Sequence, residues 1–380
     1  MPSHVAIGTW SGGRFMRFGE AVSGERFEAL MRPGGRIHTV MTADVYGEGE
    51  ADRLLGRALS GLPRFDYELV GAIGHDFYAG ERQGAKGYPR FTDPRLRGAD
   101  GYRDYVRMAT ERSLERLGVD SFDLLLLHNP DRRGFESPAV WDALREVRDE
   151  GLTSLLGIAP GPANGFTLDV IGCFERYGDL VDWAMLILNP LEPWPGELAL
   201  DAAARYDVDV ITRVVDYGGL FHDDVLPGHE FPRGDHRGFR PQGWVEAGRE
   251  KLDAMRPIAE RHGLTMLQLA CVWNLAHASV GCVVPTLIAE PGGSKPIERK
   301  RQELAAVPVA SPLTVEEVVE IRAIGDNTGT MALKGGTRDH DGEDRPDRWE
   351  VGPELAEVAA RWGIDPERDL REHAALRPLQ

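Results

Sequence analysis

The sequence has 380 residues, 42% of them hydrophobic, which is enough apolar material for one large domain or two modest ones. Its 61 acidic residues outnumber the 44 Lys and Arg residues, and the resulting formal net charge of -17 argues against a nucleic-acid partner. The 3 cysteines lack CxxC spacing, so we expect neither a disulfide framework nor a metal site.

The first residues lack the pattern of a secretory leader, and no apolar run approaches the ~18 residues that a membrane span needs. We therefore expect a cytoplasmic protein that binds a small-molecule substrate and does not associate with a membrane. Composition leaves the oligomeric state open.

Eight short runs rich in apolar and β-branched residues predict strands. They cover residues 5–10, 36–43, 67–74, 122–128, 152–159, 183–188, 207–215 and 280–285. Helical spacing of apolar residues lies between most of them, over 49–59, 104–118, 138–151, 197–206 and 244–263. This alternation predicts an α/β fold of the (β/α)8 TIM-barrel type, although periodicity alone leaves a doubly wound sheet open.

In such a barrel the chemistry lies at the C-terminal ends of the strands. Two long segments, 75–104 after the third strand and 221–244 after the seventh, are rich in Gly, Pro, aromatic and charged residues. We expect them to be loops that cover a pocket. From residue 326 the sequence becomes an acidic, Gly-rich linker, a short helix and a tail, which divides the chain into a barrel, 1–325, and an irregular extension, 326–380.

Three stretches carry a resemblance to a known family. They read "TADVYGEGEADRLLGRAL", "SLERLGVDSFDLLLLHNPD" and, more weakly, "RPIAERHGLTMLQLACVWNLAHASVGCVVP". These stretches resemble the aldo-keto reductases, and the first is most similar to the branch that acts on sugars at the anomeric carbon. The resemblance implies hydride transfer between NADPH and a carbonyl or alcohol. It also implies four strand-end residues: a Tyr that donates the proton, a Lys that lowers its pKa, an Asp that holds the Lys, and a His that orients the carbonyl.

Two of these four residues match. Tyr46 takes the place of the Tyr after the second strand, and His128 takes the place of the His at the end of "FDLLLLH". A phenol and an imidazole that project from neighbouring strand ends can both hydrogen-bond one substrate oxygen, which acid catalysis at a carbonyl requires. We therefore predict that Tyr46 donates the proton and that His128 orients the carbonyl.

The other two residues do not match, because Met41 stands at the Asp position and Ala72 at the Lys position. The Asp and Lys form one buried ion pair, so the loss of both is more coherent than the loss of one. Without an ammonium group nearby, the pKa of Tyr46 should lie near or above the usual value of about 10, which makes it a weaker acid. Asp44 is a candidate substitute for the missing carboxylate.

The positions that the resemblance assigns to the cofactor also depart from the family. A Ser-Asn pair, a Gln, a stacking aromatic and an Asn are replaced by Ala159 with Pro160, Met185, Arg213 (or, with a shift, Tyr217) and Glu303. Three basic residues, Lys295, Arg299 and Arg301, remain as candidate ligands of the 2'-phosphate of NADP at a helix N-terminus. A solvated helix face is the alternative interpretation of these charges.

Four further residues are candidate substrate contacts. Trp10 and Asn129 stand where the family places substrate-contacting side chains, and Arg237 and Trp244 belong to the segment after the seventh strand. An Arg in such a loop is suited to an anionic substrate group.

Three hypotheses about function follow. The first is a diverged aldo-keto reductase-type oxidoreductase that uses NADP and acts on a small polar carbonyl or sugar-like substrate. The second is a lyase, dehydratase or isomerase on the same barrel that uses no cofactor. The third is a non-catalytic binding protein, since a fold does not fix a function.

Overall fold

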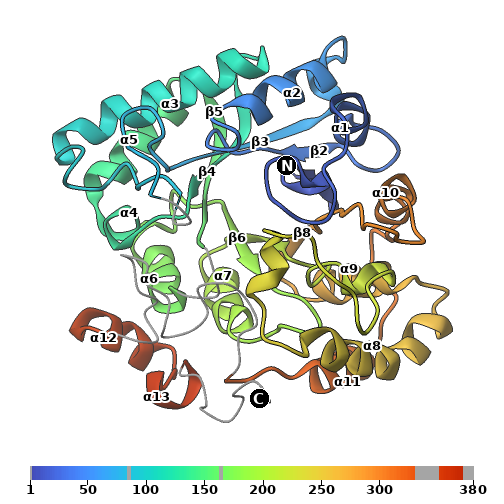
Figure 1. Cartoon of the computed structure of the whole chain (residues 1–380). Helices are drawn as coiled ribbons and strands as arrows, with labels where there is room; N and C mark the ends of the chain where they lie inside the picture. Colours follow the sequence, from blue (N-terminus) through green and yellow to red (C-terminus); the bar gives the residue numbers. More distant parts are fainter. Residues whose placement is uncertain (1, 84–86, 162–165, 330–350, 371–380) are drawn as a thin grey trace.

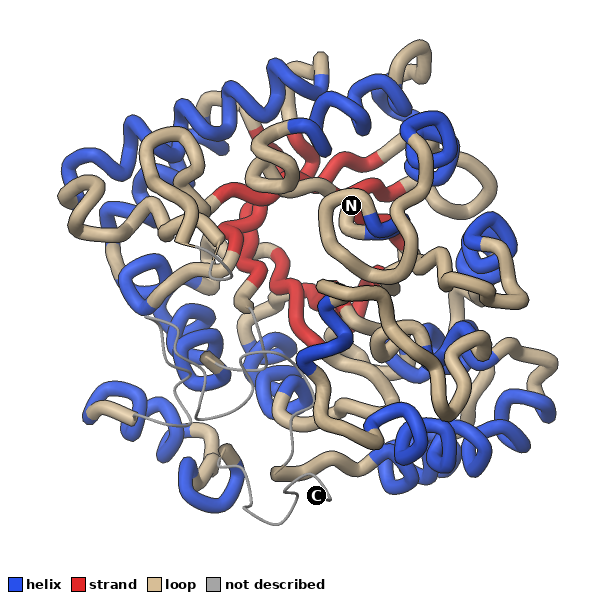
Figure 2. Tube along the Cα trace, in the orientation of Figure 1, coloured by secondary structure: helices blue, strands red, loops and turns tan. Residues whose placement is uncertain are grey.

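The computed structural model describes residues 2–83, 87–161, 166–329 and 351–370. Its centre is one sheet of eight parallel strands in the order β1 to β8. The strands are β1 Ala6–Gly8, β2 Thr39–Met41, β3 Glu68–Ile73, β4 Phe122–His128, β5 Thr153–Ala159, β6 Trp183–Ile187, β7 Asp209–Arg213 and β8 Val280–Val284. A parallel bridge between Val5 and Val283 joins the first edge to the last. Figure 2 shows the strands as a ring surrounded by helices, which confirms the predicted (β/α)8 barrel.

The strands are apolar on both faces because each one packs against two cores. On β4, Leu124 and Leu126 belong to the cluster inside the barrel, whereas Leu125 and Leu127 pack in the layer between strands and helices. Since side chains alternate along a strand, His128 shares the inward parity of Leu124 and Leu126. The same alternation places the last inward residue of each strand at one end of the barrel, where the pocket lies.

Amphipathic helices cover the outside of the ring (Figure 1). They are α1 Gly24–Met31, α2 Glu50–Leu59, α3 Tyr102–Leu117, α4 Arg132–Glu136, α5 Pro138–Asp149, α6 Thr167–Tyr177, α7 Leu200–Arg205, α8 Trp244–Arg261, α9 Met266–Leu275, α10 Ile297–Ala305 and α11 Val315–Gly325. Their ends have local causes. For example, a capping box of Thr265 and Gln268 begins α9, and Gly118, with φ of 72°, ends α3.

Of the loops at the C-terminal ends of the strands, those after β1, β3 and β7 matter most here. The two predicted long connections are present: one joins β3 to α3, and the other joins β7 to α8 and contains the short helical turns Leu220–His222 and His236–Phe239. A third loop follows β1, and Figures 1 and 2 show it lying across the ring of strands. The sequence analysis did not single out this third loop, although it supplies Met16 and Phe18 to the pocket.

The C-terminal extension contains two helices, α12 Pro353–Arg361 and α13 Pro366–Asp369. The predicted short helix is α12, which packs against α6 (Figure 1). Arg361 forms an ion pair of 2.6 Å with Glu175, and the Trp362 indole N–H donates a hydrogen bond of 2.9 Å to the same carboxylate. Most of the predicted linker, 330–350, and the tail, 371–380, lie outside the described residues. A boundary at residue 325 stays a prediction.

We found no helix among the described residues that is both long and apolar enough to cross a bilayer. Within the same residues, no group of three or more His, Cys, Asp or Glu side chains is arranged to hold a metal ion.

Candidate active site

A pocket of about 110 Å³ lies at the C-terminal ends of the strands. Most of the strands and the loop after β1 contribute to its wall. The described lining residues are Trp10, Met16, Phe18, Met41, Thr42, Ala43, Tyr46, Val70, Ala72, Leu126, His128, Asn129, Ala159, Met185, Arg213, Val214 and Thr286. This is the position where a (β/α)8 barrel carries its active site.

Tyr46 and His128 meet in this pocket. Tyr46 lies in the turn between β2 and α2, where its backbone N–H donates to the Ala43 carbonyl at 3.0 Å, and His128 is the last residue of β4. Their rings are edge to face, with centroids 5.8 Å apart. The expectation that they project from neighbouring strands was wrong, because β3 lies between β2 and β4. The rings meet nonetheless, and Ala72 of β3 lines the same pocket.

Burial keeps both groups neutral at neutral pH. It raises the pKa of Tyr46 to about 12, although the positive charge of Arg213 acts in the opposite direction. Burial, with the charges of Arg90 and Arg213, lowers the pKa of His128 to about 3. A neutral phenol and a neutral imidazole can each donate a hydrogen bond to a substrate oxygen.

Met41 and Ala72 leave the pocket wall uncharged where the family has its Asp and Lys. Both side chains are buried, at 1% and 8% exposed, and both line the pocket. Asp44 does not fill the gap: it lies outside the described pocket lining and accepts a hydrogen bond of 3.3 Å from the Tyr78 hydroxyl. Burial raises the pKa of Asp44 well above its usual value, with Asp52 adding to the effect. The missing carboxylate therefore has no substitute at this position.

Arg213 is a pocket residue that the sequence analysis noted only as the loss of an aromatic. It ends β7, and its Nη2 donates a hydrogen bond of 2.6 Å to the carbonyl of Pro160. Burial lowers its pKa, yet a guanidinium stays protonated in proteins. A signal was present in the sequence, because the resemblance gives this position to a side chain that contacts the cofactor. In the structure Ile211 faces the barrel interior, so the residue two positions later on the strand faces the same way.

Residues of the loop after β3 contact Asn129, the pocket residue that follows β4. The Asn129 side-chain amide donates to His75 Nε2 at 2.9 Å, and His75 Nδ1 lies 2.8 Å from the Tyr88 carbonyl. Arg90 donates to the Asn129 carbonyl. Burial lowers the pKa of His75 well below its usual value, so this ring is neutral and accepts from the amide.

The structure places two of the four candidate substrate contacts in the pocket and two elsewhere. Trp10 and Asn129 line it. Arg237 is 1% exposed and forms ion pairs with Asp235 and Glu290, and Trp244 stacks on Phe231 with centroids 5.7 Å apart. Neither of these two is among the described lining residues. Both hold the loop after β7 together.

The three candidate phosphate ligands contact the protein itself. Lys295 pairs with Glu303 at 3.1 Å, and the exposed Arg299 lies 3.8 Å from the same carboxylate. Arg301 donates to the backbone carbonyls of Leu30, at 2.9 Å, and Arg32, at 2.5 Å. Only Arg299 keeps most of its side chain in solvent, at 63% exposed.

Two aspartates also provide the partners for backbone N–H groups and for a lysine between the loops after β7 and β8. Asp216 accepts hydrogen bonds from the backbone N–H of Thr286, at 2.7 Å, and of Gly219, at 2.9 Å. Fully buried Lys300 forms an ion pair of 2.6 Å with Asp224. Such N–H groups and cations are what a dinucleotide phosphate needs. In the pocket itself, Ala159, Met185 and Arg213 stand where the resemblance implies nicotinamide contacts, so those family contacts are not reproduced.

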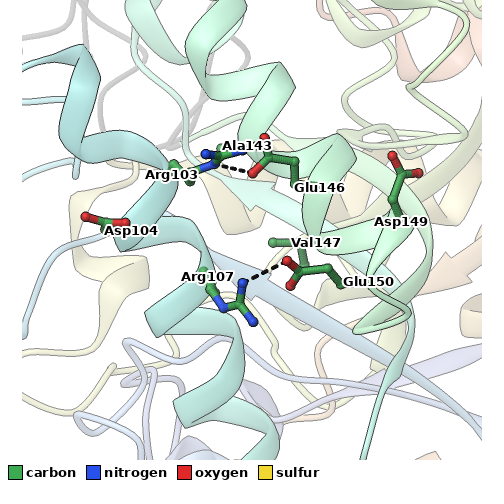
Figure 3. Close-up of a pocket in the computed structure, with 8 residues that line it drawn as sticks. All are labelled: Arg103, Asp104, Arg107, Ala143, Glu146, Val147, Asp149 and Glu150. Carbon is green, nitrogen blue, oxygen red and sulfur yellow. Dashed lines mark hydrogen bonds and ion pairs between the residues drawn. The ribbon is translucent and has the colours of Figure 1, made fainter.

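A second hollow lies outside the barrel, between α3 and α5 (Figure 3). Four of its charged side chains pair with one another, Arg103 with Glu146 and Arg107 with Glu150 at 2.7 Å. These pairs are largely exposed, so we interpret this hollow as a solvated helix-helix seam.

Comparison with known proteins decides the family. The model of the aldo/keto reductase family matches residues 4–326. The chain belongs to this family. The match confirms the resemblance found in the sequence and supports the oxidoreductase class that it implied.

Individual relatives are distant. The chain is 22% identical over 340 residues to a probable voltage-gated potassium channel subunit beta of Arabidopsis thaliana, covering 84% of this chain and 94% of that protein. It is 26% identical over 304 residues to a D-threo-aldose 1-dehydrogenase of a Pseudomonas species, covering 74% and 83%. An aldo/keto reductase of Klebsiella pneumoniae, solved in complex with NADP and acetate, superposes with a TM-score of 0.58 at 19% identity, covering 87% of this chain and 95% of that one.

Proposed function

We propose that this aldo/keto reductase barrel activates the carbonyl oxygen of a small polar substrate for reduction. Tyr46 and His128 hold the oxygen by two hydrogen bonds, and the Arg213 guanidinium stabilises the negative charge that develops on it. The observation that carries the proposal is the meeting of these three side chains in one strand-end pocket. Preorganised donors and charges at a developing oxyanion are the largest contribution to many enzymes' rate enhancement.

The pKa values favour reduction over proton abstraction. Hydride addition to a carbonyl gives an alkoxide, a stronger base than a phenolate, so Tyr46 with a pKa of about 12 can still protonate it. A lyase or isomerase needs a general base whose pKa lies near the working pH. Of the titratable groups that the described pocket lining contains, Tyr46 titrates far above neutrality, His128 far below, at about 3, and Arg213 stays charged.

Reduction also needs a hydride donor, which NADPH supplies in family members. Because the chain does not reproduce the family's contacts with that cofactor, the proposal concerns only what the protein does to the substrate oxygen. The second candidate is a lyase, dehydratase or isomerase that uses no cofactor. One observation favours it: Ala159 and Met185 line the pocket where the resemblance implies side chains that hold the nicotinamide.

A nucleotide titration separates the two candidates. NADPH and NADH are added to the purified protein, and binding is followed by calorimetry and by consumption of the nucleotide with a panel of small aldehydes and ketones. Binding with turnover supports the oxidoreductase. No binding up to about millimolar nucleotide, an affinity of about -4 kcal/mol, overturns it in favour of the second candidate.

A matched pair of variants then tests the roles of the residues. Tyr46→Phe removes the proposed donor and should lower turnover by about 100-fold or more. Tyr177→Phe removes a hydroxyl on α6, which donates to the Glu136 carbonyl outside the barrel, and should leave turnover unchanged. Equal rates for wild type and Tyr46→Phe would show that the proton comes from another group.

A further inference from the structure

Arg213 has fewer partners than a buried guanidinium normally has. Among the described residues its guanidinium makes one hydrogen bond, from Nη2 to the Pro160 carbonyl at 2.6 Å. Its Nε is buried and has no hydrogen-bond partner among the described residues. No carboxylate in the described part of the chain forms an ion pair with it, although the charge of Glu192 favours its protonated form. A buried polar group left in this state costs free energy.

Arg237, a buried arginine outside the pocket, provides a comparison. Its guanidinium is equally charged and is 1% exposed, yet it donates to both carboxylate oxygens of Asp235 and of Glu290 and to the Gly218 carbonyl. Arg213 receives no such set of acceptors. Arg213 instead lines the pocket.

The rest of the pocket does not neutralise this charge. Apart from Arg213, the described lining consists of apolar side chains, small residues and the uncharged polar groups of Thr42, Tyr46, His128, Asn129 and Thr286. The cation therefore stands alone among uncharged walls in a protein whose formal net charge is -17. In such a setting an anion gains more from a guanidinium than it would in water.

Gly161 leaves room for the guanidinium of Arg213. A Cβ on Gly161 would lie 3.3 Å from Arg213 Nη2 and would overlap the Asn129 side-chain oxygen. Glycine at this position thus lets the ends of β5 and β7 approach each other, with Arg213 and Asn129 side by side.

We propose that Arg213 forms a carboxylate-binding subsite, so that the substrate is a small carbonyl compound that carries a carboxylate next to or near the reacting carbonyl, as a 2-oxo acid does. This inference rests on the proposed function, because it places the carboxylate beside the oxygen that Tyr46 and His128 hold. Arginine is suited to this task since its planar fork of donors matches a carboxylate. The size agrees as well: a cavity of about 110 Å³ is slightly smaller than the ~150 Å³ cavity that admits benzene.

Binding measurements on a matched ligand pair test the subsite. Pyruvate and its neutral methyl ester are titrated by calorimetry into the wild type, Arg213→Met and Arg213→Lys. The wild type should bind pyruvate at least about 10-fold more tightly than the ester. Arg213→Met should weaken pyruvate binding by about 10- to 100-fold and change ester binding by less than about 3-fold. Arg213→Lys, which keeps the charge and loses the fork, should fall between them.

The control is Arg240→Met. Arg240 is a second buried arginine that lies over the rings of Tyr217 and Trp244, at 4.3 and 4.6 Å, outside the described pocket lining. This change should leave the preference for pyruvate intact. Equal affinity of the wild type for acid and ester overturns the inference, and so does an Arg213→Met variant that binds pyruvate like the wild type. If Arg213→Met does not fold, the wild-type ratio and Arg213→Lys decide.

Failure of the subsite and failure of the proposed function are distinguishable. Arg213-dependent binding of pyruvate without any nucleotide-dependent turnover would support the subsite and contradict the oxidoreductase. Turnover of neutral carbonyl compounds that falls in both Tyr46→Phe and Arg213→Met, in a wild type that binds pyruvate and its ester equally well, would do the reverse.

Discussion

Tyr46 and His128 stand edge to face with their ring centroids 5.8 Å apart. The strand between them, β3, carries the buried Ala72 at the position where the family has a lysine. This arrangement keeps two hydrogen-bond donors of the family and removes the ion pair that would activate one of them. Arg213 supplies a positive charge from another strand, β7. The predictions below follow from this neutral pair and from the buried charges around it.

Turnover should be nearly independent of pH around neutrality. The pKa of Tyr46 is raised to about 12 and that of His128 is lowered to about 3, so neither group changes its protonation state between pH 5.5 and pH 9. The measurement is kcat/KM against pH, which reports the ionisable groups of the free enzyme. A step with a midpoint near pH 6.5 that disappears in His128→Gln would contradict the neutral pair.

Restoring the family's ion pair should require both residues at once. Met41→Asp or Ala72→Lys alone places an unpaired charge at a buried site and should lower the free energy of unfolding by about 3 kcal/mol or more. The double variant should recover at least about 1 kcal/mol of the summed loss, because the two charges then pair. Urea unfolding of all four proteins gives this coupling. An ultraviolet titration of the double variant should also show a lower pKa for Tyr46. Strictly additive losses would mean that the two positions do not meet.

Buried histidines should make the protein less stable in mild acid. Burial lowers the pKa of His75, His128 and His222, so the folded state resists protonation that the unfolded chain accepts. Their contribution is fully present above about pH 6.5 and is lost as the pH falls below this value, down to about pH 3 for His128. The slope is at most about 1.4 kcal/mol per pH unit for each histidine.

Variants separate the histidines from other titrating groups. Buried carboxyls with raised pKa values act in the opposite direction, and these include Asp44, Asp52, Asp216 and Asp224. The free energy of unfolding is therefore measured at several pH values in wild type and His222→Gln. The variant should show a shallower loss between pH 6.5 and pH 5. His38→Gln, at an exposed position, is the control, and a shallower loss there as well would argue against burial as the cause.

The ion pair between the loops after β7 and β8 should be costly to break. Asp224→Asn leaves the fully buried Lys300 ammonium without its carboxylate, and this should cost about 3–5 kcal/mol. Replacing both residues together, Asp224→Leu with Lys300→Met, should cost much less, because no charge is then left unpaired.

Thermal and urea unfolding check this ion pair. Glu150→Gln is the matched control, since it breaks the exposed pair with Arg107 shown in Figure 3 and should cause no measurable change. A double variant as unstable as Asp224→Asn would show that packing, and not the charge, decides the loss.

The strands could be predicted from sequence for a clear reason. Runs such as "FDLLLLH" are apolar throughout because both faces of a barrel strand are buried, and all eight runs became strands. Tyr46 and His128 could be found because the motifs that carry the family resemblance place both of them at strand ends. The inward direction of Arg213 became evident only in the structure, where Ile211, two positions earlier on β7, faces the barrel interior.

Other features could not be found because they depend on partners far apart in the sequence. Lys300 meets Asp224 across 76 positions of chain, and Arg237 meets Glu290 across 53, so nothing local distinguishes them from solvated charges. Lys295 and Arg301 were predicted to be phosphate ligands for the same reason, because their partners could not be read from the sequence. The structure gives both of them partners within the protein.

The sequence by itself determined the barrel, through its periodicity, and the uncharged side chains of Met41 and Ala72, through the motifs it shares with the family, because both are local properties of the chain. Only the tertiary structure decided which charges remain unpaired. Burial and pairing depend on how distant segments pack. Within the part of the chain that the structure describes, this packing satisfies Arg237 and Lys300, while it leaves Arg213 with a single acceptor at the edge of the pocket.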